Sequence, residues 1–167
     1  NKNIQLNNFF WSEQLSDFLE QIVKKNKEEK AFLIGNSLGS LVGLTTLVFR
    51  EDLVAGLVAS PLPDPAFMNR IKSPNNKYIQ KIKESFIKLF FYFLPLEIIV
   101  PLISHTFIIK SALQLAYYRS INSDKELYKI ISKPAQRNTA AKALRNMCIS
   151  MTLRPKSITA PALLESI

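Results

Sequence analysis

One short segment of the sequence places a hydroxyl nucleophile between two glycines, Gly35-Asn36-Ser37-Leu38-Gly39. In this G-x-S-x-G pattern the serine can attack a carbonyl carbon if it stands at the tip of a tight strand-to-helix turn. Glycine at 35 and 39 would leave room for such a turn because it has no side chain. The first N–H group of a following helix, that of Leu38, would stabilise the negative charge on the attacked carbonyl oxygen. The pattern therefore predicts Ser37 as a nucleophile and the Leu38 N–H as an oxyanion donor.

The elements expected around this motif are those that could position it. The apolar run Ala31–Ile34 follows a charged turn and predicts a buried strand, and residues 38–49 have helical periodicity. Residues 53–60 predict a second buried strand, and Trp11 to Lys25 predict an amphipathic helix ahead of the first. A strand, a turn and a helix are the context that a nucleophile elbow requires. The alternation of helices and strands predicts a parallel sheet with helices on its faces.

A phosphate-binding turn is the main alternative for a glycine-rich segment of this kind. No G-K-[ST] follows the glycines, and Gly35, Gly39 and Gly43 are spaced by four residues. These spacings match neither the P-loop nor the G-x-G-x-x-G dinucleotide motif. The elbow is therefore the favoured interpretation.

The pattern changes at Pro61, where three prolines in five residues end the strand. From there to about Ser150 the sequence predicts only helices, at 78–94, 102–118, 124–132 and 135–151. Thr159-Ala160-Pro161 then opens a short helix. The prediction is an α/β protein in three segments: a partial core at 1–60, an all-helical cap at 61–152 and a return to the core at 153–167.

Residues from about Phe10 to Ser60 resemble the central segment of α/β-hydrolases. The resemblance is carried by Trp11-Ser12-Glu13-Gln14-Leu15 and by the pentapeptide around Ser37. Its Gly-Asn-Ser-Leu-Gly wording is similar to pheophytinase-like and related cyanobacterial or plastid hydrolases, and also to meta-cleavage hydrolases. The helical segment stands where this superfamily inserts its cap, and residues 159–164 look like the helix before the strand that carries the catalytic acid.

This resemblance implies a fragment of a serine hydrolase that cleaves esters of a hydrophobic acyl or alcohol group through an acyl-enzyme at Ser37. It places the catalytic acid just beyond Ile167, the histidine further on, and the second oxyanion donor upstream of Asn1, so the fragment itself is expected to be inactive. No cofactor or metal is expected. The implied location is the cytoplasm, or a plastid or thylakoid membrane if the source is photosynthetic. Two alternatives stay open: a meta-cleavage C–C bond hydrolase, motivated by Asn36, and a non-catalytic binding protein on the same scaffold.

Other reactive groups fit catalysis less well. His105 is the one histidine, and it lies in an apolar run rather than after a strand, so we expect it to line a pocket or bond a neighbour. Asp64 follows the second strand, where some hydrolases carry an alternative acid, but its neighbouring prolines favour a loop role. Cys148 is the one cysteine and is predicted to be a buried bystander. These counts exclude an intrachain disulfide and a multi-histidine metal site in this chain.

The net charge of +9 comes mainly from lysines spread over most predicted helices. No basic stripe with interleaved aromatics is present, so nucleic acid is not an expected partner. Residues 86–109 are very apolar, but Lys88, Pro95 and Glu97 interrupt them, which argues against a membrane span. We expect either a helical hairpin packed on the core or an apolar wall at the entrance for a hydrophobic ester. The second interpretation, with its flanking lysines, would suit peripheral membrane association.

Overall fold

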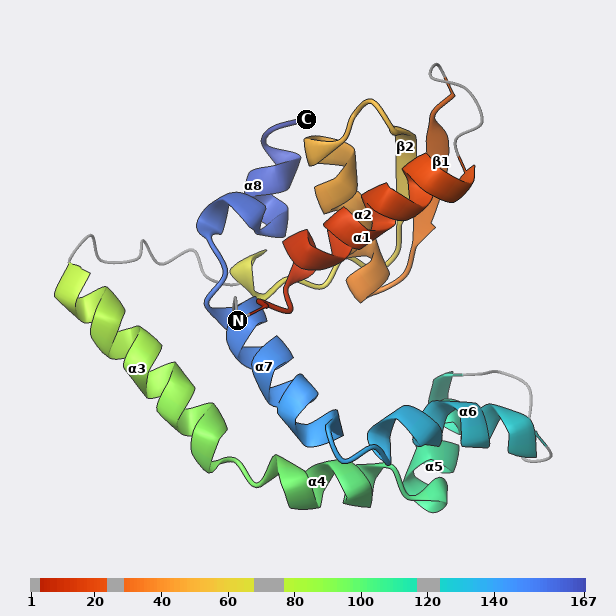
Figure 1. Cartoon of the computed structure of the whole chain (residues 1–167), viewed down its shortest axis with the longest axis vertical. Coiled ribbons are helices and arrows are strands. Elements are labelled where there is room, and N and C mark those ends of the chain that lie inside the picture. Colours follow the sequence, from red (N-terminus) through yellow and green to blue (C-terminus); the bar gives the residue numbers. More distant parts are fainter. Residues whose placement is uncertain (1–3, 24–28, 68–76, 117–123) are drawn as a thin grey trace. The chain divides into compact units, whose positions relative to one another are not determined.

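The structure is a computed structural model, and it describes residues 4–23, 29–67, 77–116 and 124–167 (Figure 1). The first part contains α1 (Asn8–Phe18), η1 (Leu19–Val23), β1 (Ala31–Gly35), α2 (Leu38–Phe49), β2 (Val54–Ala59) and η2 (Pro65–Phe67). The remainder contains α3 (Lys77–Phe93), α4 (Leu96–Ile103), α5 (Thr106–Ala116), α6 (Lys125–Ala135), α7 (Ala140–Thr152), η3 (Lys156–Ile158) and α8 (Ala160–Leu164). Two compact units result, one of Asn1–Ile82 with Ser150–Ile167 and one of Lys83–Ile149. The chain is therefore an α/β protein, as the sequence predicts.

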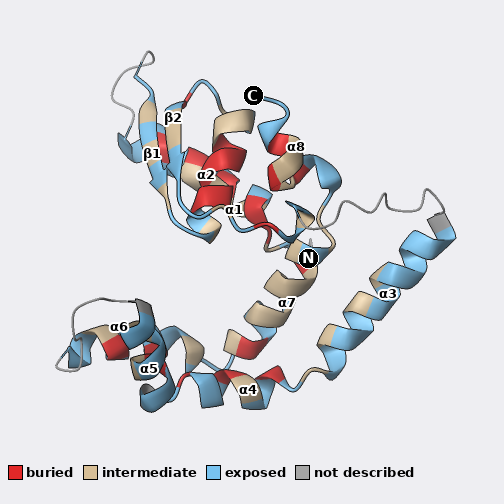
Figure 2. Ribbon diagram, turned by 180° about the vertical axis from the view of Figure 1, so that it is seen from behind, coloured by how far each residue is buried: buried red, intermediate tan, exposed pale blue. Residues whose placement is uncertain are grey.

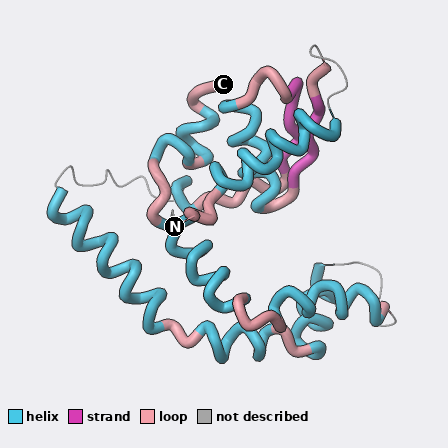
Figure 3. Tube along the Cα trace, viewed as in Figure 1, coloured by secondary structure: helices cyan, strands magenta, loops and turns pink. Residues whose placement is uncertain are grey.

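The first unit is built on a β1–α2–β2 segment. β1 and β2 pair in parallel, with Gly35 opposite Ala59 at their carboxyl ends. α1 and α8 both contact α2, which also contacts both strands (Figures 1 and 3). Leu41 and Leu44 of α2 pack with Ala160 and Leu163 of α8 in one buried cluster. The end of the described chain is thereby joined to the helix that follows the G-x-S-x-G motif.

A glycine allows α2 to lie close to the sheet. A Cβ atom added at Gly43 would stand 2.8 Å from Cδ1 of Leu57 on β2. Such a distance is shorter than packed atoms allow, so a larger residue at 43 would require the flexible Leu57 side chain to move. Glycine therefore lets the Leu57 side chain pack directly against the backbone of α2.

The expectation of two fully buried strands is wrong for one face of the sheet. Phe32 and Ile34 of β1 are 81% and 87% exposed, and Val58 of β2 is 62% exposed. Ala31 and Leu33 instead pack with Leu19, Leu53 and Val54 in a second buried cluster. Side chains alternate between the faces of a strand, and the described helices that contact this sheet cover one face. The continuous apolar run of the sequence did not reveal that this second face is exposed in the described part of the chain.

Element boundaries agree with the prediction in part. The helix predicted at 38–49 is confirmed as α2. The first helix begins earlier than predicted because the side chain of Asn7 accepts hydrogen bonds from the N–H groups of Phe9 and Phe10, and its last described turn is π-helical. Lys25, its predicted end, lies outside the described residues.

The single helix predicted at 102–118 is wrong. The structure ends α4 at Ile103 and begins α5 at Thr106. The Ser104 hydroxyl donates to the carbonyl of Pro101, 2.7 Å away, and thus closes the last turn of α4 locally. The apolar residues on either side of the polar Ser104–Thr106 segment led to the prediction of one continuous helix. Residues 117 and 118 lie outside the described part of the chain.

The second unit is helical throughout its described residues (Figure 3). Its core contains Leu96 and Val100 of α4 with Ala141 of α7. Arg145 of α7 forms an ion pair with Glu97, 2.7 Å away, and donates to the carbonyls of Phe91 and Leu94 at 2.8 and 3.1 Å. These carbonyls lie at the end of α3, where a helix leaves acceptors unsatisfied. The hydrogen bond and charge of Arg145 lower the pKa of Glu97 from 4.5 to about 2.

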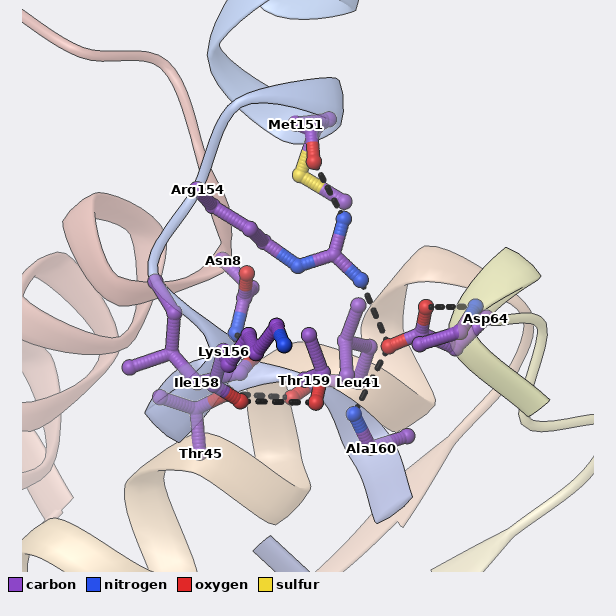
Figure 4. Close-up of polar contacts among 11 residues, drawn as sticks. Asn8, Leu41, Thr45, Asp64, Met151, Arg154, Lys156, Ile158, Thr159 and Ala160 are labelled. Carbon is purple, nitrogen blue, oxygen red and sulfur yellow. Dashed lines mark hydrogen bonds and ion pairs between the residues drawn. The ribbon is translucent and has the colours of Figure 1, made fainter. Parts of the chain in front are cut away.

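A buried ion pair ties distant segments of the first unit together (Figure 4). Asp64 and Arg154 lie 2.5 Å apart, with side chains that are 0% and 7% exposed. Asp64 also accepts hydrogen bonds from the N–H groups of Ala66 and Ala160, at 2.9 and 2.7 Å. Burial alone would raise the pKa of Asp64, but the two backbone donors and Arg154 together lower it below the usual 3.8. The carboxylate therefore stays charged and fixes the start of α8 beside the segment that follows β2.

We expect Asp64→Asn to lower the free energy of unfolding by about 3–5 kcal/mol, because breaking a buried pair leaves the other charge uncompensated. Asp52→Asn is the matched control, since Asp52 pairs with Arg50 while 56% of its side chain is exposed. It should cost less than about 1 kcal/mol. Urea denaturation followed by the fluorescence of Trp11, the one tryptophan, measures both values in the first unit.

The pH dependence of the same difference checks its electrostatic origin. Because the folded-state pKa of Asp64 is depressed, its stabilisation is present above the unfolded-state pKa and disappears as the pH falls through the folded-state value. The difference between the original protein and Asp64→Asn should thus be constant near neutral pH and shrink below about pH 4. Equal losses for the two variants, or a difference independent of acid, would contradict this role.

Candidate active site

Ser37 adopts an unusual backbone conformation between β1 and α2. Its φ and ψ are 54° and −122°, and it is the one non-glycine residue with positive φ in the described chain. A side chain in this region is sterically strained, so the surrounding structure must hold it there. Strain at this position is what a nucleophile elbow imposes on its serine. The tight turn predicted from the G-x-S-x-G spacing is therefore present.

Gly35 is the residue that makes this turn sterically possible. A Cβ atom added there would lie 2.7 Å from both the Cα and the N of Ser40, and 2.8 Å from the carbonyl oxygen of Gly39. All three are backbone atoms, which cannot rotate away as a side chain can. The end of β1 and the first turn of α2 thus approach as closely as only glycine permits.

The same explanation is wrong for Gly39. A Cβ atom added at Gly39 would meet nothing within 4 Å. Gly39 lies on the exposed side of the first turn of α2, away from the strand. Its place in the motif is consequently not explained by crowding within the described residues.

The hydroxyl of Ser37 is open to an incoming molecule. Ser37 is exposed, caps α2 by position, and makes no side-chain hydrogen bond within the described chain. Gly39 and Ser40 donate their N–H groups to the carbonyls of Asn36 and Ser37, each at 2.9 Å. The N–H of Leu38 has no hydrogen-bond acceptor among the described residues. A free hydroxyl thus lies next to a free donor at the positive end of a helix, where a developing oxyanion is stabilised.

The end of β2 supports the turn through contacts that the sequence did not indicate. The N–H of Ser60 lies 3.1 Å from both the Gly35 carbonyl and the hydroxyl of Ser40. In return, the side-chain amide of Asn36 donates to the Ser60 carbonyl at 2.9 Å. Ser40 is fully buried. A polar residue in the first turn of a largely apolar helix was the one signal that could have drawn attention to Ser40.

The other reactive groups named from the sequence are not part of this turn. His105 is exposed and lies between α4 and α5 in the second unit. Both oxygens of Asp64 are occupied by the contacts described above. Cys148 is half-buried, and burial raises the pKa of its thiol. The structure brings Ser37 and Leu38 together and gives neither of them an acid or base partner among the described residues.

Metal-ligating groups and cavities elsewhere in the described chain do not extend this site. No group of His, Cys, Asp and Glu in the described chain could hold a metal ion. A cavity of about 180 Å³ lies at the start of β1, lined by Leu19, Val23, Glu29, Lys30, Ala31 and Leu53. Ser37 follows the opposite end of that strand, so this cavity belongs to a different part of the first unit.

Comparison with known proteins gives no further guide, because the chain matches no protein-family model, no curated protein and no solved structure. A functional assignment therefore depends on the residues and geometry of the turn.

We expect Gly35→Ala to lower the free energy of unfolding by about 1–3 kcal/mol, the usual cost of overpacking, because its Cβ would collide with backbone. Gly39→Ala makes the same chemical change two residues after Ser37, where there is open space. It should leave stability unchanged or raise it by up to about 1 kcal/mol, as alanine favours a helix. Urea denaturation of both variants gives the comparison. Similar losses at both positions would show that the turn is not closed as described.

Proposed function

We propose that this chain carries the nucleophile of a serine hydrolase with the α/β-hydrolase fold, acting on an ester of a hydrophobic acyl or alcohol group. The observation that carries the proposal is the backbone of Ser37, which is strained, exposed and followed by the unused N–H of Leu38. Strain of this kind persists only where the surrounding structure enforces it, and it is concentrated at functional sites. The parallel β1–α2–β2 unit and the G-x-S-x-G wording support the same family.

The chemistry follows from this geometry. The Ser37 oxygen attacks the ester carbonyl while a base takes its proton, and the N–H of Leu38 donates to the oxyanion that forms. The tetrahedral intermediate then expels the alcohol, which receives that proton, and leaves an acyl group on Ser37. Water attacks the acyl-enzyme by the same route and releases the acid. The oxyanion of each tetrahedral intermediate forms at the same place, beside the first turn of α2.

The base is the part of this mechanism that the described residues do not supply. A serine hydroxyl is hardly ionised at neutral pH and needs an adjacent base, usually a histidine oriented by an acid. The single histidine, His105, belongs to the second unit. We therefore propose that a longer parent chain supplies the acid and the histidine after Ile167, and the second oxyanion donor before Asn1, as the resemblance implies.

The meta-cleavage alternative loses the observation that favoured it. It was motivated by Asn36 beside the nucleophile, but the amide of Asn36 donates to the carbonyl of Ser60. That contact fixes the end of β2 against the turn and is sufficient reason for an asparagine there. A non-catalytic binding protein on the same scaffold would have no use for an exposed, strained serine, so we rank it below the hydrolase as well.

Covalent labelling tests whether Ser37 is a nucleophile. In the longer parent chain, a fluorophosphonate probe should react with Ser37, because a hydroxyl activated by a base attacks phosphorus as it attacks a carbonyl. Ser37→Ala should abolish labelling, measured by in-gel fluorescence and by mass spectrometry of the modified peptide. Ser85→Ala, which removes an exposed hydroxyl from α3, is the control and should label normally. Labelling that persists after Ser37→Ala would refute the assignment.

The 167-residue chain alone tests whether the base lies outside it. We expect it to hydrolyse p-nitrophenyl esters no faster than its Ser37→Ala variant, because loss of one triad member typically costs on the order of 10⁶-fold in turnover. Hydrolysis is followed by nitrophenolate absorbance, with circular dichroism to verify that both proteins are folded. Turnover that Ser37→Ala removes would mean that the base lies within these residues, contrary to the proposal.

A further inference from the structure

Helix α3 carries a continuous apolar stripe on its surface. Its members recur at three- and four-residue spacing, which places them on one side of a helix. The α3 stripe consists of Ile79, Ile82, Phe86, Leu89, Phe90 and Phe93, and each of these side chains is between 47% and 71% exposed. Figure 2 shows α3 as exposed along most of its length. Six large apolar side chains on one helix face form a patch that soluble surfaces rarely expose without a partner.

The contacts of the neighbouring helices do not account for this stripe. The half-buried residues of α3 include Ile87 and Phe91, which lie on another side of the helix. The buried core of the second unit is formed by Leu96, Val100 and Ala141, with partly buried side chains packed around them. None of these core residues belongs to α3, and the six side chains of the stripe stay exposed.

Helix α4 also exposes apolar side chains. Ile98, Leu102 and Ile103 are 68%, 62% and 54% exposed. Within the described residues, no single helix is long and apolar enough to cross a membrane. Taken together, α3 and α4 have the length and composition of a span, but they are bent by 59° at the break between them. An amphipathic helix of this kind suits a position in the plane of a membrane interface, with its apolar side toward the acyl chains.

Charge indicates which partner would cover the stripe. Residues 83–149 contain ten lysines and arginines against four aspartates and glutamates. On α3 itself, Lys81, Lys83 and Lys88 are exposed outside the stripe. Lysine can extend its aliphatic stem along an apolar surface and place its ammonium group among lipid phosphates. A second copy of the chain would instead bring two surfaces of the same positive charge together, which opposes association.

We propose that the α3 stripe binds the surface of an anionic lipid bilayer. The apolar side chains enter the boundary between headgroups and acyl chains, and the lysines of the second unit contact the anionic headgroups. The helix is about 25 Å long, enough for all six side chains of the stripe to reach the boundary at once when it lies flat. This binding depends on the stripe and the lysines and is independent of any catalysis by Ser37.

Co-sedimentation of the 167-residue chain with vesicles tests the proposal. Vesicles of phosphatidylcholine containing about 30% phosphatidylserine should bind the protein, and pure phosphatidylcholine should bind it at least tenfold more weakly, since each lysine near an anionic surface adds about 1 kcal/mol. Added salt should weaken the binding because it screens the headgroup charge. Failure to bind the anionic vesicles, or equal binding to both kinds, would overturn the proposal.

A matched pair of variants separates the stripe from general charge attraction. Phe86→Glu and Gln80→Glu each add one carboxylate to α3, the first within the stripe and the second outside it, where Gln80 is exposed. Phe86→Glu should lower the partition coefficient at least tenfold more than Gln80→Glu, whose effect should stay near fivefold. Phe86→Ser, which adds no charge, should also bind at least tenfold more weakly than the original chain. Circular dichroism verifies that the variants are folded.

Two outcomes would assign the stripe to something else. Equal losses for Phe86→Glu and Gln80→Glu would show that attraction is electrostatic and that the stripe does not enter the bilayer. A dimer in analytical ultracentrifugation that Phe86→Glu converts to monomer, without vesicle binding by the original chain, would identify the stripe as an interface between two copies. Either result would refute the lipid proposal. The vesicle result of the original chain stands whether or not a Phe86 variant folds.

Discussion

The first unit depends on the contact between two pieces of backbone, Gly35 at the end of β1 and Ser40 in the first turn of α2. A side chain at position 35 would lie 2.7 Å from that backbone, so the strand and the helix can meet at this angle only through glycine. Ser37, between them, takes the strained conformation that the short connection requires. The serine is exposed, and the N–H of Leu38 is left unused, because the chain turns so sharply there. The reactivity proposed for the site is thus a consequence of one steric constraint.

Helix α2 connects this turn to segments that are distant in the sequence. Asn8 of α1 is fully buried and donates to the hydroxyl of Thr45 and to the carbonyl of Ile158, at 2.8 and 2.9 Å. Asp64 and Arg154 then fix the start of α8 (Figure 4). Leu163 of that helix packs in the same cluster as Leu41. Buried polar groups of this kind stabilise one arrangement because an unpaired group in the core is costly. The last described helix is therefore held in a defined position relative to the turn at Ser37.

The sequence predicted the features that depend on neighbouring residues alone. Periodicity gave both ends of α2, and the spacing of Gly35 and Ser37 predicted the turn, since each depends on neighbouring residues. The ion pair of Asp64 with Arg154 joins residues ninety positions apart, and no periodic pattern carries that information. The exposed face of β1 was missed because an apolar run does not show whether another described segment covers its side chains. The break between α4 and α5 was missed because the apolar residues on both sides of it outweighed the polar Ser104 and His105 between them.

The two proposals draw on separate physical properties of the chain. A serine hydrolase needs a strained turn and a donor, which the first unit provides with polar and backbone groups. The α3 stripe concerns apolar area and positive charge, which would act at a membrane whether or not Ser37 reacts. If both hold, they complement each other, because an ester with a large hydrophobic group partitions into bilayers and reaches low concentrations in water. An enzyme bound at the bilayer surface would meet such a substrate at a higher local concentration than one in solution. Lipid binding would then raise the rate of encounter and leave the chemistry at Ser37 unchanged.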